Sequence, residues 1–363
     1  MTEKKQSRRR FLRNSALAMA GTGLAAESFA LPNILTGKQK KVGIALVGLG
    51  NYSTNTLAPA LQETETAYLA GIVTGTPSKE NLWMEKYGIP RKNVYNYENY
   101  EEMADNTDID IIYVVLPNSM HKEYTIRAAR AGKHVICEKP MALNADECRE
   151  MIAACKENGV QLSIGYRMQF EPHTQEVMRL GQEKVLGAVM QISCGAGYRE
   201  KRPDHWKANK AMGGGAMMDM GVYPLQAARY VTGEEPVSVS ARSYVTRPEI
   251  FSEVDEIMYF DLQFPSGCVA SLATGFHTGF NYLKVFAEDG RFGLEPFSSY
   301  RGIKGSISKG VLDFPVVNQQ ATQMDEVAEC ILSGKPMRVP GEEGLRDMIV
   351  VDKIYECAAN AKC

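Results

Sequence analysis

An apolar run that ends in a glycine-rich turn limits the possible folds of this chain more than any other part of its sequence. Residues 42–47 read Val-Gly-Ile-Ala-Leu-Val, which is typical of a parallel strand buried on both faces. The turn that follows has the spacing G-x-G-x-x-G, with Ser53 at the third position. Gly48 permits a tight turn, and Gly50 lets backbone amides approach a pyrophosphate at the start of the next helix. The pattern predicts a dinucleotide-binding turn, against the alternative of an ordinary glycine-rich turn.

Strand and helix patterns alternate over the next hundred residues. Strands are predicted at 68–73, 94–95, 109–116 and 134–137, and helices up to 87, from 98 and at 123–131. This alternation predicts a doubly wound parallel sheet, whose ligands bind beyond the carboxyl ends of its strands. Asn118 and Lys139 follow two of these strands, so we expect both at the ligand site. The alternative for Lys139 is an ordinary surface lysine.

The loop after the second predicted strand distinguishes the two nicotinamide dinucleotides. An Asp or Glu here would accept a hydrogen bond from the ribose 2′-hydroxyl of NAD and repel the 2′-phosphate of NADP. The chain instead reads Thr74-Gly75-Thr76-Pro77-Ser78-Lys79, which offers hydroxyls and an ammonium. These groups favour NADP, with NAD possible if Lys79 simply lies in solvent.

From residue 189 onward the pattern changes to long extended segments joined by short turns. These segments lie at 189–199, 236–246, 255–264, 267–274 and 281–287, and two helices at 322–332 and 345–359 follow. Consecutive strands with short turns predict an antiparallel or mixed sheet. A chain of 363 residues is also too long for one core. We therefore predict a Rossmann domain at 42–165 and an α+β domain with a large, mostly antiparallel sheet at 166–363.

The N-terminus reads as an export signal. The run Ser-Arg-Arg-Arg-Phe-Leu-Arg at 7–13 precedes a weakly apolar stretch with two glycines, which is the twin-arginine pattern. Ser28-Phe29-Ala30 offers small residues to a signal peptidase. We predict a twin-arginine signal at 1–30, a short arm at 31–41 and a periplasmic location, against the alternative of a disordered basic tail.

Composition disfavours several other functions. The first thirty residues carry six Lys and Arg, and the rest of the chain is mildly acidic, which does not favour nucleic acid as a partner. None of the eight cysteines forms a C-x-x-C pair, so we expect buried thiols and no metal site. No stretch approaches the roughly 20 uninterrupted apolar residues of a spanning helix. We therefore expect no stable membrane anchor.

Five further motifs are shared with one protein family. They are P-N-x-x-H at 117–121, A-G-K-H-V at 131–135, E-K-P at 138–140, G-Y-R at 165–167 and the block G-G-G-A-M-M-D-M-G-V-Y at 213–223. With these motifs the chain resembles the Gfo/Idh/MocA family of glucose–fructose oxidoreductase, inositol dehydrogenase and MocA-like oxidoreductases. Tyr223 stands where most members carry histidine, and in this respect the chain is most similar to the glucose–fructose oxidoreductase branch.

The resemblance implies catalytic roles for Lys139, Asp219 and Tyr223. Asp219 and Tyr223 are four residues apart, hence on one helix face. Tyr223 would take a proton from a sugar hydroxyl, and Lys139 would lower the phenol pKa from its ordinary value near 10. Asp219 would hold a neighbouring hydroxyl. The alternative for Tyr223 is a half-buried core aromatic.

The resemblance also implies a set of binding residues and an assembly. Cofactor contacts would be Gly48, Gly50, Asn51, Tyr52, Thr74, Lys79, Tyr97, Leu116, Asn118, His121, Glu138, Lys139 and Arg167. Substrate contacts would be Tyr166, Trp206, Asp219 and Tyr223. The second sheet would form the interface of a homodimer or homotetramer, and the last two helices would pack partly against the first domain.

The predicted export signal and the predicted dinucleotide site together indicate which reaction the protein catalyses. No replenished dinucleotide pool exists outside the cytoplasm, so an exported enzyme must bind its cofactor tightly and regenerate it in place. We therefore expect one aldose to be oxidised at its anomeric carbon to a lactone while a second sugar is reduced. Two alternatives stay open: an NAD-dependent glycosidase that uses transient redox chemistry, and a binding module with an inactive Rossmann fold.

Overall fold

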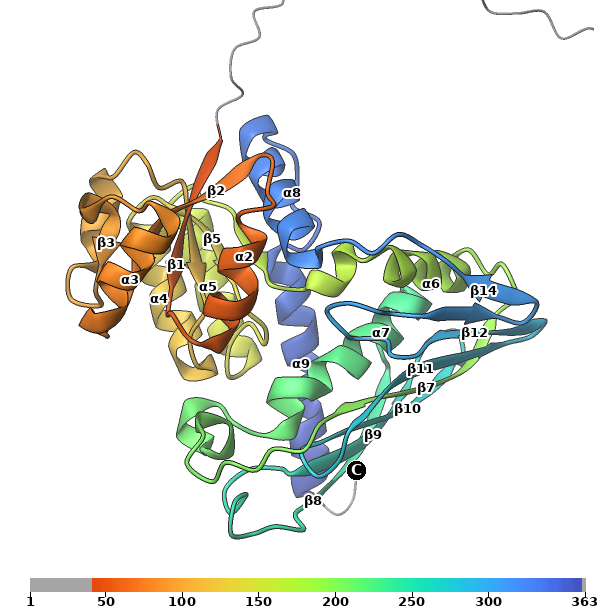
Figure 1. The fold of residues 1–363 in the computed structure, drawn as a ribbon. Helices are drawn as coiled ribbons and strands as arrows, with labels where there is room; N and C mark the ends of the chain where they lie inside the picture. The colour runs from red at the N-terminus through yellow and green to blue at the C-terminus, as the bar shows by residue number, and fades with distance from the viewer. Residues whose placement is uncertain (1–40, 361–363) are drawn as a thin grey trace, which may run out of the picture. The chain divides into compact units, whose positions relative to one another are not determined.

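The structure, a computed structural model, describes residues 41–360 (Figure 1). The signal expected at 1–30 and all but the last residue of the arm expected at 31–41 lie outside the described residues. The described chain contains two β-sheets, one of six strands and one of eight. Both belong to one compact unit.

The first sheet is parallel throughout and has the strand order β3-β2-β1-β4-β5-β6. Its strands are β1 (Val42–Val47), β2 (Ala67–Val73), β3 (Val94–Tyr95), β4 (Ile111–Val114), β5 (His134–Cys137) and β6 (Leu162–Ile164). This order is that of a doubly wound dinucleotide-binding sheet. Every residue of β1 and β4 is buried, because these central strands lie between two layers of helices. The predicted parallel sheet is confirmed, and the three-residue strand β6 was not predicted.

Local signals set the bounds of the helices around this sheet. They are α2 (Ala58–Ala60), α3 (Pro77–Tyr87), α4 (His121–Arg130) and α5 (Ala145–Glu157). Asn144 caps α5 by accepting a hydrogen bond from the Glu147 N–H, and Gly88 ends α3 in the left-handed conformation. The strand predicted at 109–116 is shorter than expected and spans Ile111–Val114, although the Val115 N–H still donates to the Val47 carbonyl of β1. The helix predicted from 98 is a 3₁₀ helix, Tyr100–Asp105.

The second sheet has the order β14-β13-β12-β11-β7-β10-β9-β8 and is antiparallel except where β7 pairs with β10. Its strands are β7 (Val189–Gly197), β8 (Ser238–Tyr244), β9 (Ile257–Gln263), β10 (Val269–Gly275), β11 (Phe280–Ala287), β12 (Gly290–Leu294), β13 (Gly305–Ile307) and β14 (Gly310–Leu312). The predicted α/β fold class, a Rossmann sheet followed by a large mostly antiparallel sheet, is therefore confirmed. The sequence did not reveal β12, β13 and β14, which are short and glycine-rich.

Helices cover one face of the second sheet and join it to the first. Figure 1 shows α6 (Pro172–Gln182) and α7 (Val222–Thr232) on that face. The long helix α9 (Gly341–Ala359) contacts α5 and β6 at one end and β8 at the other, while α8 (Gln319–Ser333) packs on β2. The Asp325 carboxylate of α8 accepts hydrogen bonds from the backbone N–H groups of residues 65, 66 and 67, at 2.9, 2.7 and 3.0 Å. Helix α8 thus fastens the start of β2 to the second half of the chain.

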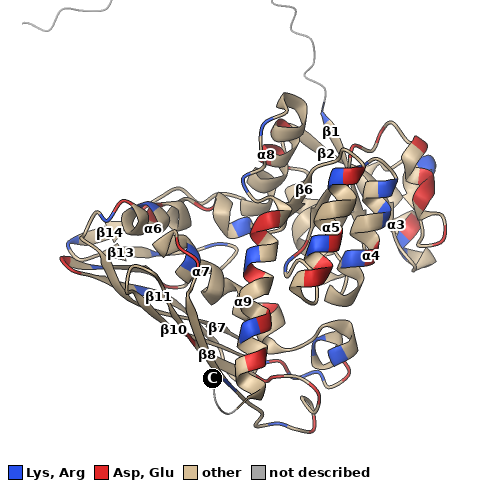
Figure 2. Cartoon of the chain, turned by 180° about the vertical axis from the view of Figure 1, so that it is seen from behind, with Lys and Arg blue, Asp and Glu red and all other residues tan. Residues whose placement is uncertain are grey.

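Charged residues are distributed unevenly over these elements. Figure 2 shows acidic and basic residues interleaved along α3, α5 and α9, whereas the long strands of the second sheet are mostly free of charge. Strands β7 and β10 contain no charged residue at all. Several large apolar side chains on this sheet are nevertheless exposed, namely Met190, Tyr244, Tyr259, Val269 and Phe286.

Candidate active site

A cleft of about 830 Å³ opens at the carboxyl ends of β1, β4 and β5. Its near wall consists of the turns that follow these three strands, including Gly50, Asn118 and Lys139. Its far wall comes from the second half of the chain and includes Asp219 and Tyr223. Ligands of doubly wound sheets bind at this edge, because the strands all end there.

The glycine turn has the geometry that a bound dinucleotide needs. Gly48 has a φ of +87°, and a Cβ there would lie 2.4 Å from the Val115 carbonyl oxygen, so only glycine fits. A Cβ on Gly50 would meet no atom within 4 Å, which leaves the backbone open to the cleft. The Ser53 hydroxyl, at the third position of the motif, donates to the Gly48 carbonyl at 2.6 Å and closes the turn. Serine therefore replaces the third glycine without loss of the turn.

The loop after β2 forms one end of the cleft. Thr74, Thr76, Lys79 and Tyr97 line it, and no carboxylate is among the lining residues of this loop. The Lys79 ammonium donates to the Leu49 carbonyl at 2.7 Å, which places its charge beside the glycine turn. Hydroxyls, an ammonium and a phenol can hold a ribose phosphate, so these side chains fit NADP.

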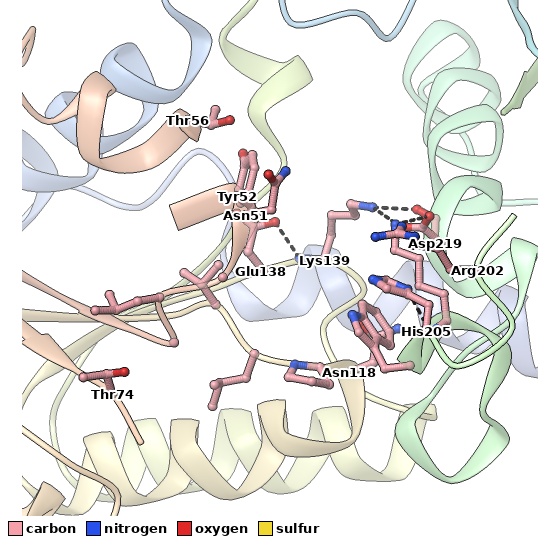
Figure 3. Close-up of a pocket in the computed structure, with 18 of the residues that line it drawn as sticks. Asn51, Tyr52, Thr56, Thr74, Asn118, Glu138, Lys139, Arg202, His205 and Asp219 are labelled. Carbon is pink, nitrogen blue, oxygen red and sulfur yellow. Dashed lines mark hydrogen bonds and ion pairs between the residues drawn. The ribbon is translucent and has the colours of Figure 1, made fainter. Parts of the chain in front are cut away.

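The three predicted catalytic residues meet at the other end of the cleft. Lys139 follows β5, Asp219 lies in the π-helical turn Met217–Gly221, and Tyr223 lies in the first turn of α7. The Lys139 ammonium lies 4.7 Å from the centre of the Tyr223 ring and donates to the Asp219 backbone carbonyl at 2.6 Å. Figure 3 shows Lys139 reaching across the cleft toward Asp219. The sheet and the helix thus bring together groups that are 80 residues apart in the sequence.

Two residues that the sequence did not single out complete the surroundings of Asp219. The Lys207 ammonium lies 2.6 Å from Asp219 Oδ2, and the Tyr198 hydroxyl donates to the same oxygen at 3.0 Å. Burial alone would raise the pKa of Asp219, but Lys207 and Lys139 outweigh it and lower that pKa below its usual value. Asp219 is therefore an ionised hydrogen-bond acceptor at neutral pH.

Buried cations also act on Tyr223. Burial alone would raise the pKa of its phenol, but Arg167 and then Lys139 outweigh burial, and the pKa lies below the ordinary value of 10. Arg167 was predicted as a cofactor contact and not as a neighbour of Tyr223. A phenol with a lowered pKa is a better proton acceptor near neutral pH.

Glu138 precedes Lys139 and lines the cleft. Its carboxylate accepts a hydrogen bond from the Tyr113 hydroxyl at 2.7 Å, and burial raises its pKa. Asn118 donates to the Gly213 carbonyl at 2.7 Å, and so joins the end of β4 to the glycine block of the second half. Glu138 also accepts a hydrogen bond from the Lys139 backbone N–H at 3.2 Å, and so helps to position Lys139.

Most of the predicted site residues line the cleft. These are Gly48, Gly50, Asn51, Tyr52, Thr74, Lys79, Tyr97, Leu116, Asn118, Glu138, Lys139, Trp206, Asp219 and Tyr223. Figure 3 shows how Asn51, Tyr52 and Asn118 surround the end of the first sheet.

Three predicted contacts, His121, Tyr166 and Arg167, are not among the residues that line the cleft. The ring nitrogens of His121 lie 2.8 Å from the Pro140 carbonyl and 2.9 Å from the Leu116 carbonyl, so this histidine links two cleft loops from behind. Tyr166 is only 2% exposed and lies in the core near Asp347 of α9 rather than beside a substrate. Arg167 is buried behind Tyr223.

Several cleft residues were missed by the sequence reasoning. They are Tyr198, Arg202, His205, Lys207 and Tyr300. Four of them lie in the segment that follows β7, and Tyr300 lies between β12 and β13. Their neighbour Trp206 was predicted, so a search for polar residues around this tryptophan would have found three of them.

Metal binding, membrane insertion and the state of the cysteines are three further features of residues 41–360. No group of three or more His, Cys, Asp or Glu in this part of the chain is arranged to hold a metal ion. Within the same range, no helix is both long enough and apolar enough to span a bilayer. Six of the described cysteines, Cys137, Cys148, Cys155, Cys194, Cys268 and Cys330, are buried free thiols.

Two family profiles match this chain. Residues 42–166 match the Gfo/Idh/MocA profile described as "Oxidoreductase family, NAD-binding Rossmann fold", and residues 174–293 match the "GFO/IDH/MocA C-terminal domain". The chain belongs to the Gfo/Idh/MocA family. The predicted resemblance is therefore confirmed, as is the expectation of an oxidoreductase with a nicotinamide dinucleotide site.

Members of the Gfo/Idh/MocA family align with nearly all of this chain. The D-xylose 1-dehydrogenase [NADP(+)] of Haloarcula marismortui is 26% identical over 338 residues, which are 89% of this chain and 92% of that enzyme. The crystal structure of the aldose-aldose oxidoreductase of Caulobacter crescentus is 41% identical, with a TM-score of 0.86 over 89% of this chain and 99% of that one. The 3-ketoreductase KijD10 of Actinomadura kijaniata, at 24% identity and a TM-score of 0.77, shares the fold.

Proposed function

We propose that this protein is an NADP-dependent sugar oxidoreductase that oxidises an aldose at its anomeric carbon to a lactone. The observation that carries the proposal is the Lys139 ammonium 4.7 Å from the Tyr223 ring, at the far end of a cleft that begins at the glycine turn. Relatives named as a xylose dehydrogenase and as an aldose-aldose oxidoreductase support a sugar as the substrate.

The side chains of the cleft can perform each proton step of this oxidation. Tyr223, as the phenolate, takes the proton from the anomeric hydroxyl, and Lys139 stabilises the phenolate charge until then. The ionised Asp219 accepts a hydrogen bond from a neighbouring sugar hydroxyl and so orients the ring. A bound nicotinamide dinucleotide supplies the acceptor for the hydride that leaves the anomeric carbon. In the reverse direction Tyr223 returns its proton to the oxygen of a carbonyl sugar.

Retention and regeneration of the cofactor form the second part of the proposal. An aldose-aldose oxidoreductase by name couples two sugars, and a relative of that name at 41% identity supports the same cycle here. In such a cycle a retained dinucleotide would supply the hydride store between the two sugars, while Tyr223 takes a proton from the first sugar and returns it to the second. The cleft of about 830 Å³ is large enough for a dinucleotide and one sugar ring at a time.

The cycle is tested with protein purified without added nucleotide. Native mass spectrometry should show one NADP per subunit, and an added aldose should yield one lactone per subunit together with the absorbance of reduced nicotinamide. A second sugar should then remove that absorbance and let lactone accumulate over many turnovers. Protein that arrives empty and turns over only with soluble NADP or NAD would contradict the retained cofactor while leaving the dehydrogenase activity in place.

Export by the twin-arginine route belongs to the same proposal. The motif at 7–13 supports this part of the proposal. The twin-arginine route carries folded proteins, and so suits an oxidoreductase that binds its cofactor before export. A double variant, Arg9→Lys with Arg10→Lys, should leave the full-length protein in the cytoplasm, whereas wild type should appear shortened in the periplasmic fraction. Equal distribution of the two proteins between fractions would contradict export.

A glycosidase with transient redox chemistry is the alternative function, and it uses the same cleft. A tyrosine and a retained dinucleotide suit both aldose oxidation and glycoside cleavage, so the assay must distinguish these two reactions by their products. Release of nitrophenol from aryl glycosides, without net lactone formation, would favour the glycosidase. Lactone formation from free aldoses with no nitrophenol release supports the proposed function.

Assembly through the second sheet completes the proposal. The face opposite α6 and α7 carries exposed apolar side chains, including Tyr259 at 50% and Met190 at 55% exposure. Exposed apolar surface of this kind on an extended sheet is typical of a subunit interface. We therefore propose a homodimer, or a homotetramer built from two such dimers.

A further inference from the structure

Arg167, the last residue of the G-Y-R segment at 165–167, was expected to contact the cofactor but lies elsewhere. It follows β6, is only 4% exposed, and is absent from the lining of the cleft. Its guanidinium lies between two phenol rings, 5.1 Å from the centre of Tyr223 and 4.4 Å from the centre of Tyr300. The side chain therefore contacts the back of the proposed catalytic tyrosine rather than a ligand.

Hydrogen bonds hold the guanidinium in this place. It donates to the backbone carbonyls of Ser298 and Ser299 and to the side-chain oxygen of Gln319, at the start of α8. These acceptors are neutral, and no ion pair to Arg167 is present among residues 41–360. A buried guanidinium without a carboxylate partner keeps its full positive charge for its neighbours.

The other charged and titratable groups around Tyr223 include Lys139, Glu138, Tyr52 and Tyr300. Lys139 faces the ring from β5, and Glu138, whose pKa burial raises, comes from the same strand end. Tyr300, whose pKa is also raised by burial, lies beyond Arg167. Lys139 also interacts with Asp219. Its ammonium donates a hydrogen bond to the Asp219 backbone carbonyl and lies 3.6 Å from Asp219 Oδ1. Arg167 also interacts with Glu138, but it forms no ion pair among residues 41–360, and it lowers the pKa of Tyr223 more than Lys139 does.

We propose that Arg167 is a positioning residue that favours the phenolate form of Tyr223 through its buried charge and touches neither cofactor nor sugar. This inference rests on the proposed function, because it assigns the proton transfer to Tyr223. Lys139 then has a different main task, which is to face the substrate while it is anchored to Asp219. Arginine suits the buried place because its planar fork of donors serves the acceptors of Ser298, Ser299 and Gln319 at once.

The test compares four variants by the pH dependence of kcat/KM for aldose oxidation. Arg167→Met and Arg167→Gln remove the charge, and Arg167→Lys keeps it. Arg127→Met is the matched control, because Arg127 also lies over two phenol rings, those of Tyr100 and Tyr124, at 4.7 and 4.8 Å. A second readout is the ionisation of Tyr223 itself, measured as the near-ultraviolet difference between each protein and the same protein with Tyr223→Phe.

Loss of the charge should move the acid limb of the pH profile upward by about one unit or more, with about a tenfold loss of rate at neutral pH that recovers at higher pH. The ionisation of Tyr223 should move by the same amount. Arg167→Lys should stay close to wild type, and Arg127→Met should leave the limb unchanged. Arg167→Gln keeps a polar side chain with hydrogen-bond donors, and so provides a second neutral variant if Arg167→Met does not fold.

Two results would overturn the inference. One is a rate loss that is equal at every pH in both neutral variants, since this is what a purely structural role predicts. The other is an unmoved ionisation of Tyr223. Failure of the proposed function gives a different result: wild type would oxidise no aldose, while the ionisation of Tyr223 would still report whether Arg167 controls it.

Discussion

At the scale of single residues, the cleft depends on how two cations and one carboxylate surround a phenol. Tyr223 is 8% exposed, and burial by itself would keep its proton in place. Arg167 and Lys139 reverse that tendency, and Asp219 is kept ionised by Lys207 and Lys139. The arrangement places a phenol with a lowered pKa beside an ionised carboxylate, which fits the roles proposed for Tyr223 and Asp219.

Removal of the Tyr223 hydroxyl should remove the proton acceptor and little else. Tyr223→Phe should lower kcat for aldose oxidation by about a hundredfold to ten-thousandfold, the usual contribution of a general base. KM and bound dinucleotide should change little, because the ring keeps its place between Arg167 and Lys139. Steady-state kinetics and native mass spectrometry check both points, with Tyr259→Phe on the outer sheet as the control.

The pH dependence of the wild-type enzyme should have two limbs. The rate should rise with pH as Tyr223 loses its proton, and this limb should lie below pH 10 because the pKa of Tyr223 is lowered. Burial alone would lower the pKa of Lys139, but Tyr223 and Asp219 raise it above 10.5, so the second limb, a fall, belongs above that value. In Lys139→Met the first limb should move upward and the second should disappear. A profile of kcat/KM that keeps both limbs in this variant would contradict the assignment.

At the scale of elements, short segments from the second half of the chain complete a site that begins in the first half. The turn Met217–Gly221 and the start of α7 place Asp219 and Tyr223 opposite the end of β5. Asp255 supports this turn by accepting a hydrogen bond from the Met217 N–H at 2.7 Å. The helices α8 and α9 then tie the two sheets together.

The docking of α8 on β2 can be tested by stability. Asp325→Ala removes a carboxylate that accepts three backbone hydrogen bonds, at residues 65 to 67. The free energy of unfolding in urea should fall by about 2 kcal/mol, since hydrogen bonds to a charged group are stronger than neutral ones. Glu326→Ala, which removes an exposed ion pair with Arg338, should cost about 0.5 kcal/mol or less. Equal losses in the two variants would show that Asp325 contributes no more than an ordinary surface charge.

At the scale of the whole molecule, the second sheet has one face covered by helices and one face with exposed apolar side chains. Neighbouring strands β7 and β10 carry no charge, and Tyr259 of β9 and Val269 of β10 are 50% and 41% exposed. Such a face would be costly to leave in water over several strands.

Charges placed on this face should therefore separate the subunits. The double variant Tyr259→Glu with Val269→Glu should shift native mass spectra from dimer or tetramer to monomer, because two buried carboxylates would lie in the interface. Tyr68→Glu, at a 37% exposed position on β2, is the control and should leave the assembly intact. A monomeric wild-type protein would contradict the proposed interface outright.

The sequence by itself determined the Rossmann half with its main strands, and it placed Asp219 and Tyr223 on one helix face. Those conclusions rest on local chemistry: apolar runs, glycines that alone allow a turn, and a spacing of four that puts Asp219 and Tyr223 on one face. The second sheet was predicted only in outline, because strands as short as β13 and β14 have no periodicity to read.

The tertiary structure decided which side chains meet. Tyr166 and Arg167 were both predicted as ligand contacts from their motif, yet one packs in the core and the other lies behind Tyr223. Lys207 became part of the site only because its loop folds back onto Asp219. Such contacts depend on the packing of segments far apart in the chain, and no local pattern records that packing.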